Sequence, residues 1–540
     1  MIAGLGIGLP AILRAPRPRA SGAATTLYAM KFLVKLSPEI TIKSRPVRQR
    51  FTNQLRTNIA RVFRYYQIGA DVVSRWDMLE VLVPVDLPEP EYRRRCEQAR
   101  YQLGRLPGIA HFIQVQERVI DLETPLDTQL EVIARETLAI YRERVAGRSF
   151  AVRCKRQGDH VFSSHQVERY VGAEILKHCA PGRVQLKDPE VTVSLEIKRS
   201  RLYIVEQRDS GLGGYPIGCV GPALSLISGG YDSSVASFMA MRRGMNVNFC
   251  FFNLGGHGHE VGVKQVSHFL WEQYSCTHHT AFINIDFAEV VAEILTKISN
   301  PFMGVVLKRM MYRAASQIAE QMQIDTLITG ENVAQVSSQT IKNLAVIDSV
   351  SDTLVMRPLI MHDKSDIIEQ AVRIGVAEFA EHMPEYCAVI SDKPATAAKL
   401  VDIEREEALF DFAVLQRAVA DRRLCRIDKL YQQEVHAMAE VESLSMPRPG
   451  QVVIDLRAPD EADARPLTLH ANKVMQIPFF QINRLFGTLE KNAQYLLYCD
   501  RGVMSKLHAA HLRAEGFDNV DVYRPDAASL NSAAEPGAVE

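Results

Sequence analysis

Two short segments of this 540-residue chain hold residue types that suit phosphate binding and sulfur chemistry. The first is Ser-Gly-Gly-Tyr-Asp-Ser at 228–233, directly after an apolar run that ends at Ile227. The second is Tyr-Cys-Asp-Arg-Gly at 498–502, which places Cys499 after another apolar run. Together the two segments predict a protein that activates a substrate with ATP and then transfers sulfur to it.

The segment at 228–233 predicts a loop between a strand and a helix. Gly229 and Gly230 let backbone N–H groups approach phosphate oxygens closely, and the following helix adds its positive end. The hydroxyls of Ser228 and Ser233 supply further donors. Asp232 beside such an anion site indicates a cation between them, and Mg²⁺ fits best. The segment lacks the Gly-Lys-Ser/Thr of a Walker A loop, and a glycine turn that serves geometry alone is the alternative.

The segment at 498–502 predicts a reactive thiol. Cys499 should lie in a tight loop between a strand and a helix that starts near Ser505, where backbone N–H groups stabilise a thiolate that can hold a persulfide. Arg501 adds positive charge. The loop resembles a rhodanese cradle, but it has Asp500 beside the cysteine, and Met504 and Ser505 where thiosulfate-using enzymes would carry further basic residues, which favours a protein as the sulfur donor. A buried, unreactive cysteine is the alternative.

The elements around these loops predict an α/β multidomain protein, as the chain length requires. Two α+β units come first, then repeated strand–loop–helix units that indicate a doubly wound parallel sheet, then a last small α/β unit. The predicted divisions are 1–29, a disordered extension or a misassigned start before Met30; 30–103 and 104–208, two small α+β domains; 209–405, the parallel-sheet domain; 406–446, a helical linker; 447–525, the last domain; and 526–540, a loose tail.

The charge is unevenly distributed, although the formal net charge is zero. Residues 31–210 hold 31 Lys and Arg against 23 Asp and Glu, so the remainder of the chain is acidic. The basic residues Arg153, Lys155 and Arg156 stand at a predicted strand-to-loop edge, which suits contacts with phosphates. A basic front half predicts a polyanionic partner, and a basic surface without a partner is the alternative.

Cysteine usage and hydropathy favour the cytoplasm. The nine cysteines are scattered and no two have CxxC spacing, which argues against a disulfide framework and against a structural zinc site. No apolar run reaches the roughly 20 residues that span a bilayer, so we expect no contact with a membrane.

The loop at 228–233 resembles that of the PP-loop ATP pyrophosphatases, and further segments resemble the tRNA 4-thiouridine synthetase (tRNA sulfurtransferase) family. These segments are Phe-Phe-Asn-Leu-Gly-Gly at 251–256, Leu-Lys-Arg-Met-Met at 307–311, Thr-Gly-Glu at 329–331, Val-Ser-Ser-Gln-Thr at 336–340 and Met-Pro-Glu-Tyr-Cys at 383–387. The resemblance runs from Met30 to Pro525. It implies a ferredoxin-like domain, a THUMP domain, a PP-loop domain and a rhodanese domain, in that order.

This resemblance implies an enzyme that adenylates uridine 8 of tRNA with MgATP, releases AMP and pyrophosphate, and forms 4-thiouridine. It implies that a persulfide on Cys499 supplies the sulfur, that Cys387 becomes its disulfide partner, and that Asp232 acts at the ATP site. Lys364 is a weaker candidate for phosphate binding. The implied ATP-binding residues are Leu226, Ile227, Ser228, Gly229, Gly230, Ser233, Lys308, Gly330 and Gln339.

The resemblance also implies the partners of the reaction. They are tRNA, an IscS-like cysteine desulfurase that donates sulfur, the sulfur-carrier protein ThiS used to make the thiazole of thiamine, and a cellular reductant. A homodimer fits the family, and no bound prosthetic group is expected. Two alternatives stay open: sulfur transfer to the carrier protein alone, and a tRNA-binding sulfur relay without catalysis.

Overall fold

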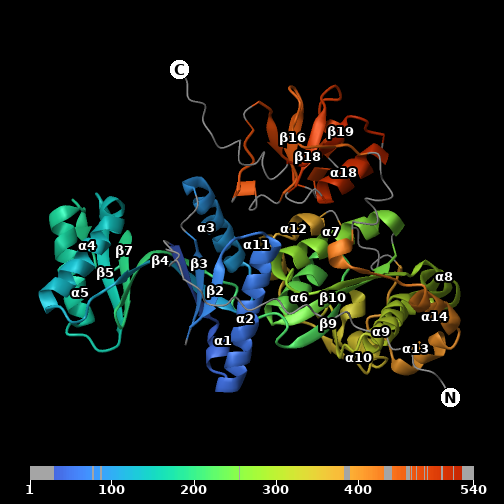
Figure 1. Ribbon diagram of the computed structural model, residues 1–540. Helices are drawn as coiled ribbons and strands as arrows, with labels where there is room; N and C mark the ends of the chain where they lie inside the picture. Colours follow the sequence, from blue (N-terminus) through green and yellow to red (C-terminus); the bar gives the residue numbers. More distant parts are fainter. Residues whose placement is uncertain are drawn as a thin grey trace, which may run out of the picture.

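In the computed structural model the described part of the chain folds around three sheets (Figure 1). Within it, no helix is long and apolar enough to cross a membrane. The predicted extension 1–29 and tail 526–540 lie outside the described residues. The structure describes residues 30–75, 78–84, 88–254, 256–381, 383, 390–430, 441–457, 462–463, 465–469, 471–478, 481–482, 485–499, 503–514 and 516–525.

The first sheet has eight strands in the order β2-β3-β1-β4-β8-β7-β5-β6. Its long strand β4 pairs antiparallel with β1 on one side and with β8 on the other, so it joins the two predicted α+β units into one sheet. Strand β4 was not predicted from the sequence. The strands are β1 Met30–Leu36, β2 Asp71–Ser74, β3 Leu79–Val83, β4 Ile109–Val119, β5 Ser149–Gln157, β6 Arg183–Val184, β7 Val191–Lys198 and β8 Arg201–Ser210.

Helices cover each half of this sheet and close two separate cores. The first turn of α5 is fixed by a capping box, in which Ser163 accepts from the N–H of Gln166 while the Gln166 side chain accepts from the N–H of Ser163. This capping box fixes where α5 begins. The helices are α1 Pro38–Thr41, α2 Arg45–Tyr65 and α3 Glu89–Gly104 in the first half, and α4 Leu126–Val145 and α5 Ser164–His178 in the second.

The second sheet has six strands in the order β13-β12-β9-β10-β11-β14. The chain runs from β9 outward through β10 and β11, then returns to the other side of β9 with β12 and β13, and these five strands are parallel. The predicted doubly wound parallel sheet is confirmed. Its strands are β9 Gly221–Leu226, β10 Met245–Asn253, β11 Ala281–Asp286, β12 Thr326–Ile328, β13 Leu354–Met356 and β14 Arg423–Arg426.

Both faces of this sheet are covered by helices. The core on one face includes side chains of α6 Tyr231–Arg242, α7 Gly256–Tyr274, α11 Lys364–Arg373 and α12 Ala377–Glu381. The core on the other face includes side chains of α8 Ala288–Lys297, α9 Met303–Gln321, α10 Ile341–Asp348, α13 Leu400–Glu407 and α14 Phe412–Ala420.

Residues 406–446 differ from the helical linker that the sequence predicted. Helix α14 packs on the sheet, and β14 pairs antiparallel with β11 and becomes its edge strand. Residues 406–430 therefore belong to the parallel-sheet domain, whereas β15 Ser443–Leu444 belongs to the third sheet. The predicted helical stretch after residue 430 falls largely on residues 431–440, outside the described residues.

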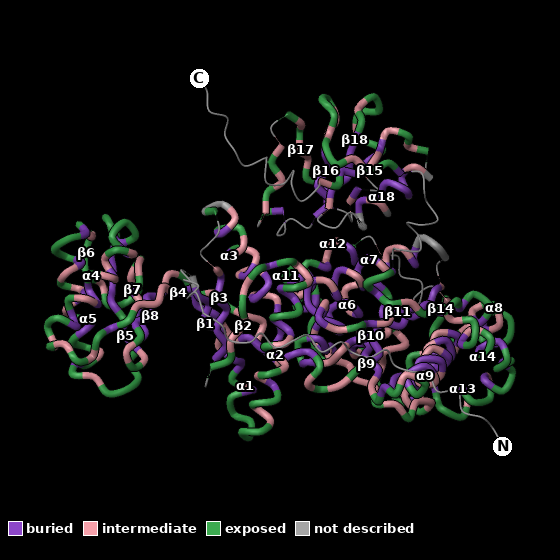
Figure 2. The backbone as a smooth tube through the Cα atoms, in the orientation of Figure 1, coloured by how far each residue is buried: buried purple, intermediate pink, exposed green. Residues whose placement is uncertain are grey.

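The third sheet is parallel, in the order β15-β19-β18-β16-β17, and helix α18 Val503–Ala514 packs on it. This domain sits over α7 and α12 in Figure 1, and its buried residues continue the core that contains α6 and α7. Figure 2 shows buried residues both in this last domain and in the parallel-sheet domain below it. The strands are β15 Ser443–Leu444, β16 Val452–Asp455, β17 Val474–Gln476, β18 Tyr495–Tyr498 and β19 Val520–Tyr523.

Candidate active site

The loop after β9 presents free backbone donors at the first turn of α6. It is held by Ser233, whose Oγ lies 3.1 Å from the Ser228 nitrogen and 3.0 Å from the Ser228 Oγ. Within the described residues, four consecutive N–H groups there donate to no protein acceptor, those of Gly229, Gly230, Tyr231 and Asp232. Unpaired N–H groups at a helix N-terminus form a site for an anion such as phosphate.

Gly330 follows β12 and lies directly against this loop. A Cβ at position 330 would stand 2.5 Å from the backbone carbonyl carbon of Asp232 and 2.5 Å from the backbone nitrogen of Ser233. Neither backbone atom can shift without moving the first turn of α6. Glycine therefore allows the ends of β9 and β12 to meet at the point where strand order reverses, which is where doubly wound sheets bind ligands.

Replacing Gly330 by alanine is expected to lower the free energy of unfolding by about 2 kcal/mol, because the added methyl group overpacks a backbone contact. Thermal unfolding followed by circular dichroism measures this change. Gly104→Ala is the matched control, since nothing lies within 4 Å of a Cβ there. A melting temperature that falls no further in Gly330→Ala than in Gly104→Ala would contradict the expected close contact.

Glu331 places a buried carboxylate beside Gly330. It is 5% exposed and accepts hydrogen bonds from Lys308 Nζ at 2.8 Å, Arg357 Nε at 2.8 Å and Tyr312 Oη at 2.5 Å. Burial alone would raise the pKa of Glu331, but the two cations hold it at about 2. The predicted phosphate ligand Lys308 thus lies at this edge of the sheet, with its ammonium paired to Glu331.

Asp232, the predicted metal ligand, accepts from Lys364. The Lys364 Nζ lies 2.8 Å from both carboxylate oxygens, and Gln335 Nε2 lies 2.9 Å from Oδ2. The positive group next to Asp232 is therefore the ammonium of Lys364. Within the described residues, no cluster of three or more His, Cys, Asp or Glu could hold a metal by itself. One carboxylate beside a phosphate cradle nevertheless fits Mg²⁺ that arrives with a nucleotide, because Mg²⁺ keeps mainly water and phosphate ligands.

The remaining predicted ATP residues lie around the same edge. Leu226 ends β9, and Ile227 is 3% exposed, so Ile227 can contact a nucleotide only through its backbone. Gln339 lies in the short 3₁₀ helix Ser337–Gln339, and its Oε1 lies 3.4 Å from the nitrogen of Asn332. The structure thus brings the ends of β9 and β12 and the loop at 332–339 together around one edge.

Cys499 lies at the end of β18 and contacts the first turn of α18. Its Sγ lies 3.4 Å from both the backbone nitrogen and the Oγ of Ser505, a fully buried residue. Beside this loop Arg457 forms a buried ion pair with Asp455 at 2.6 Å and lies over the ring of Tyr498. Asp500, Arg501 and Gly502 lie outside the described residues. A thiol in contact with a helix N-terminus can become a nucleophilic thiolate.

Cys387, the predicted disulfide partner, lies outside the described residues, as do Pro384, Glu385 and Tyr386. Of the described residues on either side, Met383 lies close to the phosphate loop and Ile390 lies near α9. A Cβ on Gly229 would stand 2.5 Å from the Cε of Met383. Ile390 lies near Gly304 in α9, one turn before Lys308. The described residue Met383, just before the segment that carries Cys387, therefore lies beside the candidate ATP site, and Ile390, just after it, lies beside α9.

Helix α7 connects the phosphate loop with the domain that carries Cys499. Near its start, His259 Nε2 lies 3.2 Å from the carbonyl oxygen of Ser228. Further along, the buried side chain of Gln265 places Nε2 3.4 Å from Nε2 of His508 in α18. One helix thus contacts the phosphate loop and the helix whose first turn touches Cys499. Nothing in the sequence signalled this link, because α7 and α18 are more than 200 residues apart.

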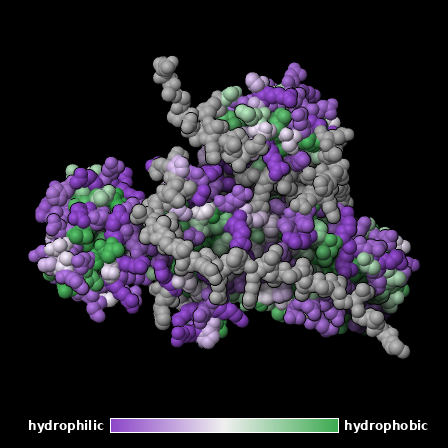
Figure 3. All heavy atoms as spheres, viewed as in Figure 1, coloured by the Kyte–Doolittle hydropathy of each residue, from purple (hydrophilic) through white to green (hydrophobic). Residues whose placement is uncertain are grey.

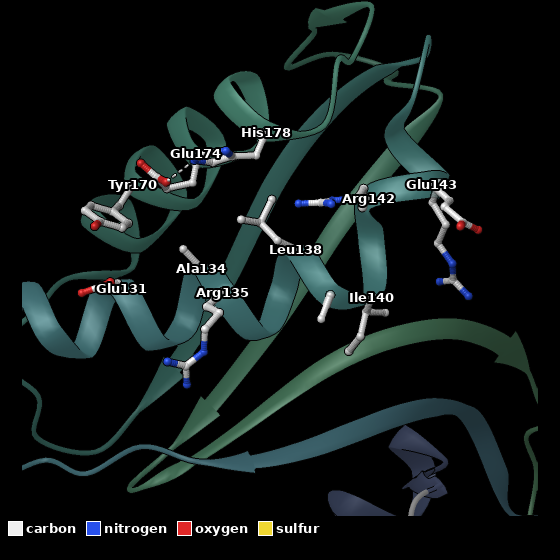
Figure 4. A pocket seen from close by; sticks show the side chains of 12 residues that line it. Glu131, Ala134, Arg135, Leu138, Ile140, Arg142, Glu143, Tyr170, Glu174 and His178 are labelled. Atoms are coloured by element: carbon white, nitrogen blue, oxygen red, sulfur yellow. Dashed lines mark ion pairs between the residues drawn. The ribbon is translucent and has the colours of Figure 1, made fainter.

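A separate hollow of about 690 Å³ lies between α4 and α5, away from both loops. Figure 4 shows its polar lining, including the ion pair between Glu174 and His178, and Figure 3 shows hydrophobic atoms on the same lobe. Its charged residues have mixed signs, and no residue that lines it is a cysteine or serine. We assign no chemistry to this hollow.

Comparison with known proteins places the chain in a family. A family model described as thiamine biosynthesis protein (ThiI) matches residues 218–412, and the THUMP domain model matches residues 127–205. The tRNA sulfurtransferase of Pectobacterium atrosepticum is 49% identical over 496 residues, which cover 92% of this chain and 100% of the relative. The chain belongs to the tRNA sulfurtransferase family. The relative of the same name from Pseudomonas aeruginosa PAO1 is also 49% identical, with the same coverage.

A solved structure agrees with this assignment. The crystal structure of a 4-thiouridine synthetase–RNA complex with bound ATP matches this structure with a TM-score of 0.63 and 25% identity. The match covers 74% of this chain and 99% of that chain. The α/β multidomain fold expected from the resemblance to the tRNA sulfurtransferase family is therefore confirmed.

Three residues of the site were assigned no role from the sequence. Gln335 lies 103 positions from the aspartate that it contacts, and His259 lies 31 positions from Ser228. Such long-range polar contacts leave no local pattern. Glu331 could have been found, because an acidic residue directly after a buried strand needs cationic partners.

Proposed function

We propose that this protein is an ATP-dependent sulfurtransferase that converts a uridine of tRNA, uridine 8, to 4-thiouridine. The observation that carries the proposal is that one chain holds both a cradle of free N–H groups and a cysteine at a helix N-terminus, on domains joined through α7. The substrates are supported by the name of the tRNA sulfurtransferase relatives, and by the RNA and the ATP bound to the solved 4-thiouridine synthetase.

The first step uses the phosphate loop. Its N–H groups bind the phosphates of ATP, and Lys364 exchanges its ion pair with Asp232 for contacts with phosphate oxygens. Asp232 would then hold Mg²⁺, which neutralises charge on the phosphates. Leu226, Ile227, Gly330 and Gln339 line the nucleotide. The C4 oxygen of the uridine attacks the α-phosphorus and pyrophosphate leaves, so that AMP becomes the leaving group at C4.

The second step uses the thiols. A cysteine desulfurase loads Cys499 as a persulfide. The S–S bond of the persulfide breaks, the terminal sulfur bonds to C4, and AMP leaves. Cys387 supplies the thiolate that forms a disulfide with Cys499, and a dithiol reductant restores both thiols. The contact of Met383 with Gly229 of the phosphate loop supports this role, because Cys387 follows Met383 by four residues in the sequence.

The basic front half is proposed to hold tRNA through its backbone. Arg153, Lys155 and Arg156 are all exposed on β5, and Arg153 and Lys155 share the face of the strand opposite to the buried Cys154. Phosphate contacts of this kind position an RNA without reading its sequence.

Sulfur transfer to the sulfur-carrier protein ThiS is a second candidate function. The matched family model is described as a thiamine biosynthesis protein, which favours it. Only Cys499 and its domain are needed for that transfer, and the phosphate loop would then be dispensable.

Formation of 4-thiouridine in unmodified tRNA tests the proposal. The assay contains the protein, MgATP, cysteine and a cysteine desulfurase, and nucleosides are separated by chromatography after digestion. We expect product with the complete mixture and none without ATP or with Asp232→Ala. Absence of product from wild-type protein that binds ATP and accepts sulfur would overturn the tRNA assignment and leave the carrier protein as the acceptor.

A further inference from the structure

His259 lies near the start of α7, beneath the phosphate loop, where its side chain packs against β10. It is 6% exposed, and its ring meets the ring of Phe251 edge-on, with centroids 4.8 Å apart. Its Nε2 lies 3.2 Å from the carbonyl oxygen of Ser228. A carbonyl oxygen can only accept, so Nε2 carries the proton and donates. Burial lowers the pKa of His259, which keeps the imidazole neutral.

This hydrogen bond fixes the orientation of one peptide group of the loop. In a trans peptide the C=O and the following N–H point in opposite directions. Because the Ser228 carbonyl points at His259, the N–H of Gly229 points away from α7. That N–H is one of the four free donors of the cradle.

The same peptide can rotate unless something holds it. Gly229 has φ +85°, and a flip of the preceding peptide would change that φ by about 180°, to a negative value that glycine also adopts freely. The flip would turn the N–H of Gly229 toward α7 and present a carbonyl oxygen to the cradle. A carbonyl oxygen there would repel phosphate oxygens.

We propose that His259 is a positioning residue of the ATP site, which holds the 228–229 peptide so that the Gly229 N–H faces the phosphates of ATP. The inference rests on the proposed function, since it assigns a role at the same site. His259 does not touch the reacting atoms. It acts through the backbone of Ser228, and α6 holds the other side of this residue through Ser233.

Matched variants separate the hydrogen bond from packing. In His259→Gln the side-chain amide nitrogen can occupy the place of Nε2 and donate to Ser228. In His259→Asn the shorter amide reaches only the place of Nδ1. In His259→Phe the ring that packs on Phe251 remains but the donor is lost. Thermal unfolding of each full-length variant establishes that it is folded.

Titration calorimetry with MgATP and with adenosine tests the role directly. We expect the dissociation constant for MgATP to rise about tenfold in His259→Phe and His259→Asn. This is the effect of losing one charge-assisted hydrogen bond, from the Gly229 N–H to a phosphate oxygen. His259→Gln should recover to within about threefold of wild type. Adenosine, which has no phosphate, should bind all four proteins alike, whereas a general distortion of the fold would weaken it too.

The outcomes distinguish this inference from the proposed function. Unchanged MgATP affinity in folded His259→Phe or His259→Asn overturns the positioning role alone. Equal loss of adenosine and MgATP binding also overturns it. Wild-type protein that binds no MgATP overturns both. Wild-type protein that binds MgATP with the expected variant pattern but forms no 4-thiouridine supports the positioning role and overturns the proposed function.

Discussion

Replacing Cys499 by serine is expected to abolish sulfur transfer, because a hydroxyl oxygen cannot carry a persulfide. The variant should still fold, since serine fills nearly the same volume and can keep the contact with Ser505. After incubation with desulfurase and cysteine, mass spectrometry should find one added sulfur atom on wild-type protein and none at position 499 of the variant. The yield of 4-thiouridine should fall by at least about a thousandfold.

Cys219→Ala is the matched control for this prediction. Burial raises the pKa of Cys219 to about 11, so this thiol stays protonated and unreactive. The control should keep full sulfur transfer. If Cys499→Ser also keeps transfer, another cysteine carries the sulfur and the assignment of the loop after β18 is wrong.

Replacing Glu331 by glutamine is expected to lower the free energy of unfolding by about 3 kcal/mol, because it leaves two cations beside a neutral buried group. The melting temperature should fall by at least about 6 °C. The exposed pair of Glu369 with Arg373 provides the control. Glu369→Gln should change the free energy of unfolding by less than about 1 kcal/mol.

The pH dependence of this effect follows from the depressed pKa of Glu331. A carboxylate whose pKa is about 2 in the folded protein and about 4.3 unfolded stabilises the fold above about pH 5. That stabilisation is lost as the pH falls from about 5 toward 2. The difference in melting temperature between wild type and Glu331→Gln should therefore shrink over this range. A difference that stays constant down to pH 3 would contradict the ion-pair account.

Local patterns in the sequence predicted the elements that carry the site. The apolar runs before residues 228 and 499 predicted β9 and β18, because a buried strand of a parallel sheet is apolar on both faces. The repeated strand–loop–helix units that follow in the sequence predicted the doubly wound sheet. Strand β14 was not predicted from the sequence. Its residues at 423–426 are largely exposed, and the strand pairs only with β11, at the edge of the sheet.

The arrangement of charges could not be predicted in the same way. The sequence suggested Mg²⁺ beside Asp232 and phosphate beside Lys308, whereas the structure pairs Asp232 with Lys364 and Lys308 with Glu331. Each pair joins residues 23 or more positions apart, and only the fold decides which opposite charge lies nearest. Both lysines nevertheless lie at the edge of the sheet that carries the phosphate loop.

Single-turnover transfer of labelled sulfur tests most directly whether the two loops serve one reaction. Protein carrying a ³⁵S-persulfide on Cys499 is freed from desulfurase and cysteine, then mixed with unmodified tRNA with or without MgATP. We predict that the label moves to 4-thiouridine when MgATP is present and stays on the protein when it is absent. Label that reaches tRNA without ATP, or that never reaches tRNA with ATP, would contradict the proposal that the ATP loop and Cys499 act on the same uridine.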